Sequence, residues 1–230
     1  MLEIKAQSVV WDFDGTILDS FRIQKDVLTE VLQRRGMTVP DHEVFVHNYH
    51  GRLHDSVGAI AGITGVLLDE IVKEFMQTEE HLYAEIEQLY FSDALDLMRR
   101  CHELGLPQII VSNRRHCSDV WAGSPRNLAN RRPLAGLVDR VVCADDNDAV
   151  WKPNARSLDE AERELGLDRT KSVIIGDQFV DAEFAHNLHA RAVLVDRTPE
   201  GVPHLERLVD GWQDRVYIVE GLHSVSIARI

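Results

Sequence analysis

The sequence predicts an α/β protein in which an open parallel sheet carries helices on both faces and a separate group of helices is inserted near the N-terminus. Short apolar runs alternate with amphipathic helical segments over most of the chain. This alternation is interrupted once, between residues 19 and 91, where only helical patterns occur. At 230 residues, with 44% hydrophobic and 27% charged residues, the chain can form one sizeable core and a smaller domain.

The first predicted element is a buried strand over residues 9–11 that leads into two acids, Asp12 and Asp14. Side chains alternate along a strand, so both acids point the same way if the strand continues through them. Gly15 indicates a turn, because glycine tolerates unusual dihedral angles and close backbone approach. Two crowded carboxylates repel each other unless a cation or a shared proton intervenes, which makes a magnesium site the first hypothesis. Ordinary turn acids are the alternative.

The insertion is predicted to be helical throughout, since no segment in it alternates as a strand does. The expected domain boundaries are 19–91 for the insertion and 1–18 with 92–230 for the core. Its helices are expected over Asp19–Arg35, after Asp41, over Leu53–Ile60 and over Leu67–Leu89, the last as one helix or two.

The alternation of strands and helices resumes after the insertion, beginning with a helix from Ser92 to Gly105. In an open parallel sheet, ligands lie outside the carboxyl ends of the strands, so polar residues at those ends are candidates for function. The further strands are expected over Pro107–Val111, Val138–Cys143, Val173–Ile175, Ala192–Val195 and Val216–Val219.

Polar side chains follow the later strands in a definite order. Ser112 and Asn113 end one apolar run, Lys152 precedes a helix, and Asp177 ends another run with Asp181 one helical turn beyond it. Each has an ordinary structural alternative, as a turn former, a surface charge or an acid at a helix N-terminus. Together, at strand ends, they favour a site for a phosphoryl group and its metal.

Four ordered motifs resemble those of the haloacid dehalogenase superfamily of phosphotransferases. They are Asp12-Phe13-Asp14-Gly15-Thr16, Ser112-Asn113, Lys152-Pro153 and Gly176-Asp177-Gln178-Phe179-Val180-Asp181. The resemblance extends from the first strand to about Val195 and implies a Rossmann-like core. The helical insertion resembles the C1 cap of phosphoglycolate-phosphatase-like and β-phosphoglucomutase-like members.

The resemblance implies roles for the acids. Asp12 would be the nucleophile that forms an aspartyl-phosphate, and Asp14 the general acid and base. Magnesium would be held by Asp12, the backbone carbonyl of Asp14 and Asp177. Asp181 would act through a metal-bound water or by orienting Lys152.

The phosphoryl oxygens would be held by the polar groups of the second and third motifs. Ser112 and Lys152 supply a hydroxyl and an ammonium, and backbone amides near Gly15 and Asn113 could add to this cradle. The expected function is therefore magnesium-dependent hydrolysis of a small phosphorylated metabolite. Two alternatives are kept, a β-phosphoglucomutase-like isomerase and a non-catalytic protein that binds a phosphorylated ligand.

Within the insertion, the segment from Gly51 to His54 is the predicted substrate loop, with Arg52 and His54 as candidate contacts to the leaving group. The arginines after the second motif have two interpretations, attraction of a polyanionic substrate or, more commonly for such runs, a solvated surface. They are Arg114, Arg115, Arg126, Arg131 and Arg132.

Composition excludes several other classes. A formal net charge of -13 disfavours a general nucleic-acid or anionic-membrane binder. The three cysteines contain no Cys-x-x-Cys pair, so no zinc site is indicated. The N-terminus enters a strand almost at once and no apolar run is long enough to span a bilayer, so a cytoplasmic location is expected. The oligomeric state is left open.

Overall fold

The structure of the protein is a computed structural model. It describes residues 1–48, 53–82 (without the side chains of 80–82), 89–114, 123–144, 146, 150–197, 205–206, 209 and 211–230. The chain forms two compact units, one comprising Met1–Leu18 with Leu89–Ile230 and the other Asp19–Gln88.

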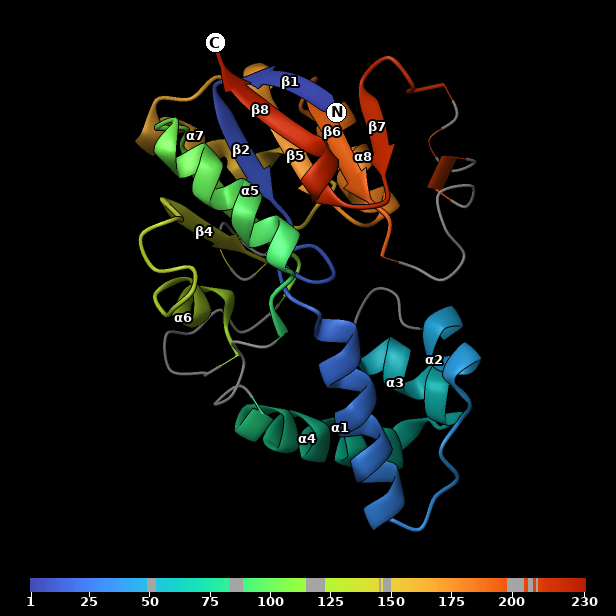
Figure 1. Cartoon of the computed structure of the whole chain (residues 1–230). Coiled ribbons are helices and arrows are strands. Elements are labelled where there is room, and N and C mark those ends of the chain that lie inside the picture. Colours follow the sequence, from blue (N-terminus) through green and yellow to red (C-terminus); the bar gives the residue numbers. More distant parts are fainter. Residues whose placement is uncertain are drawn as a thin grey trace. The chain divides into compact units, whose positions relative to one another are not determined.

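The larger unit is built on a six-stranded sheet (Figure 1). Its strand order is β4-β3-β2-β5-β6-β7, and every neighbouring pair is parallel. The strands read as nearly continuous apolar runs because both faces of such a sheet are covered. Their bounds are β2 Ser8–Trp11, β3 Gln108–Ser112, β4 Arg140–Cys143, β5 Ser172–Gly176, β6 Arg191–Val195 and β7 Val216–Val219.

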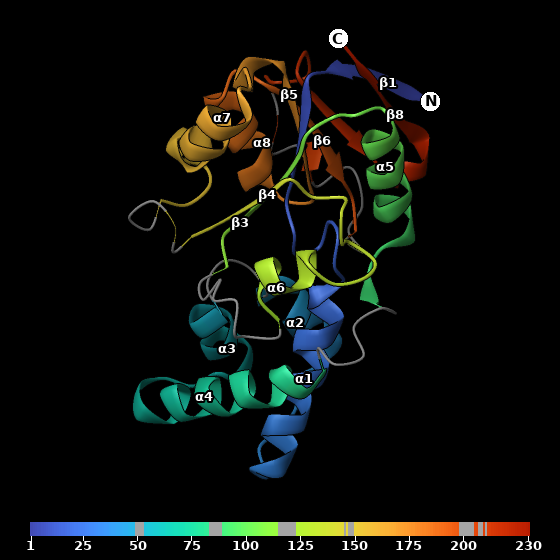
Figure 2. The same cartoon turned by 90° about the vertical axis from the view of Figure 1, so that its left-hand side faces the viewer.

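Helices cover both faces of this sheet, which confirms the predicted α/β class. Figure 2 shows the sheet between α5 on one side and α7 and α8 on the other. One core joins Val10, Ile109 and Ile174, from three adjacent strands, to Ala161 of α7 and Phe184 of α8. The helices of this unit are α5 Ser92–Glu103, α6 Pro125–Ala129, α7 Asp159–Leu165 and α8 Phe179–Asn187.

A second, two-stranded sheet joins the two ends of the chain. Strand β1, Leu2–Ala6, pairs in parallel with β8, Val225–Arg229. Ile4 and Ala6 of β1 are buried, whereas Glu3 and Lys5 are exposed. Neither strand is predicted from the sequence as a partner of the other.

The smaller unit is helical, and its described residues contain no strand, as the sequence predicts. Asp19 caps the first helix by accepting a hydrogen bond from the Arg22 amide at 3.2 Å. Phe45, Ile71 and Phe75 are almost completely buried. The helices are α1 Ser20–Arg34, α2 His42–Asn48, α3 Leu53–Ala61 and α4 Gly65–Leu82.

No helix within the described residues is long and apolar enough to cross a membrane.

Candidate active site

The predicted site residues of the core follow three neighbouring strands. Asp12 follows β2, Ser112 ends β3 and Asp177 follows β5. Strand β2 lies between β3 and β5 and pairs with both in parallel, so the three carboxyl ends meet at one edge of the sheet. The strand order reverses at β2, because β3 and β4 lie on one side of it and β5 to β7 on the other. Ligands of doubly wound folds bind at such a switch point.

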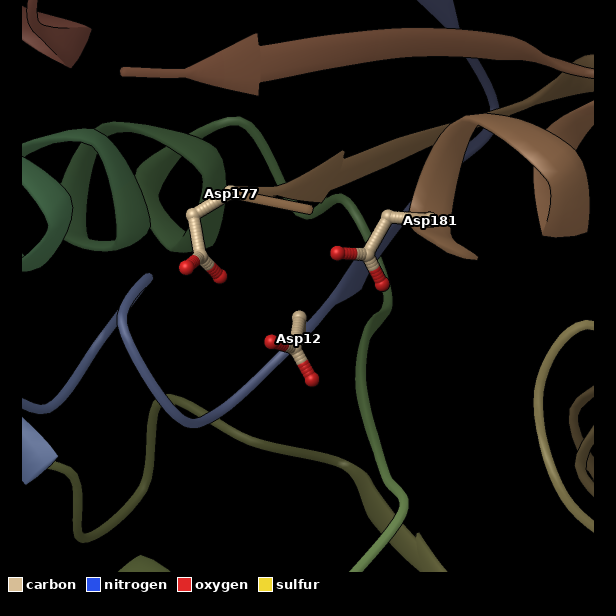
Figure 3. A group of neighbouring side chains, drawn as sticks. All are labelled: Asp12, Asp177 and Asp181. Carbon is tan, nitrogen blue, oxygen red and sulfur yellow. The ribbon is translucent and has the colours of Figure 1, made fainter. Parts of the chain in front are cut away.

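Three carboxylates converge at this edge. Asp12, Asp177 and Asp181 each offer one oxygen, and these oxygens lie within 4.8 Å of one another. Figure 3 shows the three side chains pointing toward a common space from the end of β2, the end of β5 and the first turn of α8. Asp181 is fully buried and Asp12 is 8% exposed. The described residues thus contain an oxygen-rich cluster of the kind that holds Mg²⁺.

Two glycines allow the acids to approach the backbone. Gly15 has φ +76°, and a Cβ atom there would lie 2.2 Å from Oδ2 of Asp177. A Cβ atom at Gly176 would lie 2.2 Å from Cγ of Asp181. Thr16 donates a hydrogen bond from Oγ1 to Oδ1 of Asp177 at 3.0 Å. Gly15 is therefore required by the position of an acid far away in the sequence, and Gly176 by that of an acid five residues further along the chain.

Lys152 lies among the acids with only 3% of its side chain exposed. Its Nζ donates to Oδ1 of Asp12 at 2.5 Å and to Oδ1 of Asp181 at 2.7 Å. Asp181, predicted either to act through a metal-bound water or to orient Lys152, is thus in direct contact with the lysine. The positive charge of the ammonium favours the ionised form of Asp12.

Asn113 holds the backbone of Lys152 in place. Its Nδ2 donates to the Lys152 carbonyl at 3.1 Å, and the Lys152 amide donates to its Oδ1 at 2.8 Å. The side-chain amide predicted to meet a phosphoryl oxygen is thus bonded to the loop that carries the lysine. Neighbouring Ser112 is 2% exposed, and its Oγ accepts a hydrogen bond from the Arg114 amide at 3.1 Å.

The charges of the cluster are not balanced by the protein alone. Burial raises the pKa of Asp12 to about 7, and the charges of Asp181 and Asp14 add to this against the opposing effect of Lys152. Burial, with the charges of Asp12 and Asp181, also raises the pKa of Asp177 well above its usual value. Burial would lower the pKa of Lys152, but its two acidic partners outweigh this and raise it. One ammonium among three carboxylates leaves a site suited to a divalent cation.

Arg114 is a site residue that the sequence analysis missed. Its Nε donates to Oδ2 of Asp14 at 2.7 Å, and its Nη2 donates to Oδ1 at 2.5 Å. Only 10% of its side chain is exposed, so the interpretation of the arginine run as a solvated surface is wrong at this position. Its place two residues after Ser112 was the available signal. Arg126 of the same run forms an ion pair with Asp146.

The predicted cap contacts are only partly described. Arg52 lies outside the described residues. His54 is on α3 with 51% of its side chain exposed, and its Nε2 lies 3.0 Å from Oδ1 of Asp69 on α4. The role of both residues in substrate selection stays a prediction.

The fold and the site together define an α/β enzyme with an acidic site for a cation at the carboxyl end of a parallel sheet. The family model of haloacid dehalogenase-like hydrolases matches residues 6–189. The chain therefore belongs to the haloacid dehalogenase-like hydrolases, which confirms the family predicted from its motifs.

Two relatives of known activity resemble the chain over most of its length. The phosphoglycolate phosphatase of Rhodobacter capsulatus is 26% identical over 229 residues, covering 90% of this chain and 98% of the relative. The (S)-2-haloacid dehalogenase of Pseudomonas putida is 30% identical over 197 residues, covering 79% of this chain and 80% of the relative.

Solved structures share the fold. CbbY from Rhodobacter sphaeroides, in complex with phosphate, has a TM-score of 0.70 at 15% identity, with 95% of this chain and 96% of that chain covered. A family IA hydrolase from Entamoeba histolytica has a TM-score of 0.71 at 14% identity, with 96% and 95% covered.

Proposed function

We propose that this hydrolase is a magnesium-dependent phosphomonoesterase that acts on a small phosphorylated metabolite through an aspartyl-phosphate at Asp12. The observation that carries the proposal is the buried cluster of Asp12, Asp177 and Asp181 around Lys152, with Asp14 two residues after the nucleophile. The raised pKa values of Asp12 and Asp177 support a bound cation, because a cation favours the ionised carboxylates that burial disfavours.

The donors fit magnesium, since each of the three acids offers a carboxylate oxygen and the described site offers no sulfur or imidazole ligand. Asp12 and Asp177 would hold the ion with the backbone carbonyl of Asp14, and Asp181 would orient Lys152. When bound, the ion supplies positive charge that lets an anionic phosphate approach an anionic nucleophile.

In the first half of the reaction, a carboxylate oxygen of Asp12 forms a bond to phosphorus as the bond from phosphorus to the leaving oxygen breaks. Asp14 transfers a proton to that leaving oxygen, which departs as an alcohol. Ser112 and Lys152 donate hydrogen bonds to the phosphoryl oxygens, where charge must be stabilised.

In the second half, water attacks phosphorus while Asp14 takes one of its protons. The bond between phosphorus and Asp12 then breaks and inorganic phosphate is released. The same carboxyl group serves both halves, first as an acid and then as a base. This double use depends on its lying beside the nucleophile in both steps.

The similarity to a haloacid dehalogenase favours a second candidate, hydrolysis of a carbon–halogen bond by Asp12. That reaction releases a halide, which needs no proton, so it does not explain a second acid at Asp14. The pair of acids and the cation site therefore support phosphate transfer. The phosphoglycolate phosphatase relative makes phosphoglycolate the first substrate to test.

The decisive experiment is a hydrolysis screen with phosphoglycolate, sugar phosphates, nucleoside monophosphates and 2-chloropropionate, each with and without magnesium. Phosphate release that requires magnesium and is lost in Asp12→Asn is the expected result. The asparagine lacks the attacking oxygen at nearly unchanged volume, so kcat should fall at least about a thousandfold. Halide release, transfer of phosphate within a sugar, or full activity in excess chelator would contradict the proposal.

A further inference from the structure

Arg114 clamps the carboxyl group of Asp14 from a distant part of the chain. Its Nε and Nη2 each donate to a different oxygen of Asp14, at 2.7 and 2.5 Å, across a separation of 100 residues. Such a two-point contact between a planar guanidinium and a carboxylate fixes both the position and the plane of the acid. The side chain of Asp14 is itself 27% exposed.

The arginine is in turn held by the protein on several sides. Its Nη1 donates to the Gly123 carbonyl at 2.8 Å, and its guanidinium lies 5.5 Å from the centre of the Phe13 ring. Its backbone amide bonds to Oγ of Ser112. Each of the three guanidinium nitrogens therefore donates to the protein, and the side chain connects the end of β3 to the loop after β2.

We propose that Arg114 is a positioning residue that holds Asp14 beside the scissile bond for both proton transfers, an inference that rests on the proposed function. A displacement of about 1 Å in a reacting group can cost about a hundredfold in rate. A protonated carboxyl group keeps acceptor capacity on its oxygens, so the clamp can hold Asp14 as an acid and as a base.

The alternative is that Arg114 releases Asp14 and binds the phosphoryl group of the substrate. The two roles differ in a measurable way. A phosphoryl contact is shared by all phosphomonoesters, whereas a positioned proton donor matters only for leaving groups that need a proton. Alkyl alcohols need one, and p-nitrophenolate leaves largely without it.

The test compares Arg114→Met with the wild type on glycerol phosphate and on p-nitrophenyl phosphate. The kcat/KM reports the steps up to loss of the leaving group. It should fall about 30-fold or more for glycerol phosphate and less than about 3-fold for p-nitrophenyl phosphate. For p-nitrophenyl phosphate, kcat and KM should fall together by about 10-fold. Hydrolysis of the aspartyl-phosphate needs Asp14 as the base whatever the leaving group was, so the variant slows this second step.

Three further variants complete the test. Arg114→Lys keeps the charge but not the two-point contact, so it should show the same selective loss at a smaller size. It carries the test if Arg114→Met does not fold. Asp14→Asn should lose activity on glycerol phosphate, and adding Arg114→Met to it should cost nothing more. Arg140→Met is the matched control, since Arg140 pairs with Glu160 and Glu164 away from the site.

Equal losses of kcat/KM on both substrates, or a further loss in the double variant, would overturn the positioning role and show a direct contact with the phosphoryl group. The proposed function would still stand in that case, provided that the wild type hydrolyses the esters with magnesium. If the wild type with magnesium hydrolyses neither ester, the proposed function fails and the role of Arg114 fails with it.

Discussion

Replacement of Gly15 by alanine should lower the affinity for magnesium while the core stays folded. A Cβ atom at Gly15 would lie 2.2 Å from Oδ2 and 2.6 Å from Cγ of Asp177, so this side chain must move. The movement would break the 3.0 Å hydrogen bond from Thr16 and withdraw one carboxylate from the cluster. Loss of correctly oriented partners around a metal typically lowers affinity by about 10- to 100-fold.

The matched control is Gly166→Ala. Gly166 also has a positive φ, 65°, but a Cβ atom there would meet nothing within 4 Å. Both variants bear the backbone cost of a left-handed alanine, about 1 to 2 kcal/mol. Only Gly15→Ala also displaces Asp177. The difference between the two variants therefore isolates the effect on the metal site.

The assay is thermal unfolding with and without magnesium. At about one hundred times the wild-type Kd, magnesium should stabilise the wild type by about 2.7 kcal/mol, and a hundredfold weaker site by only about 0.4 kcal/mol. At about 3 °C per kcal/mol for a chain of this size, Tm should rise by about 8 °C in the wild type and in Gly166→Ala, and by about 1 °C in Gly15→Ala. A full wild-type shift in Gly15→Ala would refute the role of the glycine in admitting Asp177.

Three more predictions concern the charge of the site, the lysine and the cap. Without metal, the free energy of unfolding should fall as pH rises from about 4 to 7, because the raised pKa of Asp12, about 7, keeps a proton in the folded state that the unfolded chain has released. Chemical denaturation at several pH values measures this, and saturating magnesium should flatten the slope; an equal slope with the ion bound would contradict it. Asn113→Ala removes both hydrogen bonds to the Lys152 backbone. It should therefore lower kcat about 10-fold or more and the free energy of unfolding by about 1 to 3 kcal/mol. Unchanged kinetics would show that other contacts position the lysine. His54→Ala should reduce kcat/KM for the best metabolite more than for p-nitrophenyl phosphate, because cap contacts select the leaving group. Proportional losses on both would exclude that role.

The sequence by itself determined the strands of the six-stranded sheet and the order of the chemical groups at their ends. Buried parallel strands are covered on both faces, so they appear as apolar runs whose ends are marked by polar residues. The runs ending near Asp12, Ser112 and Asp177 could be recognised for this reason. The helical periodicity of the insertion was equally local, and its described helices begin within a few residues of the predicted starts.

The tertiary structure alone decided which strands are neighbours. Strands β1 and β8 lie at opposite ends of the chain, and β1 has only two buried residues, Ile4 and Ala6, which alternate with the exposed Glu3 and Lys5. A short, half-polar strand carries too weak a local signal to identify so distant a partner. Its stability depends on a pairing that no window of sequence contains.

Long-range contacts also explain why the roles of some site residues were predicted and those of others were not. An acid at a strand end is recognisable because the strand is local, but a side chain's partner is chosen by the fold. Asn113 bonds to a backbone 39 residues away, and Arg114 reaches Asp14 across 100 residues. In the sequence both are polar residues after a strand. The pairing of β3 with β4, the strand before Lys152, brings Asn113 to the lysine backbone, and the pairing of β3 with β2 brings Arg114 to Asp14.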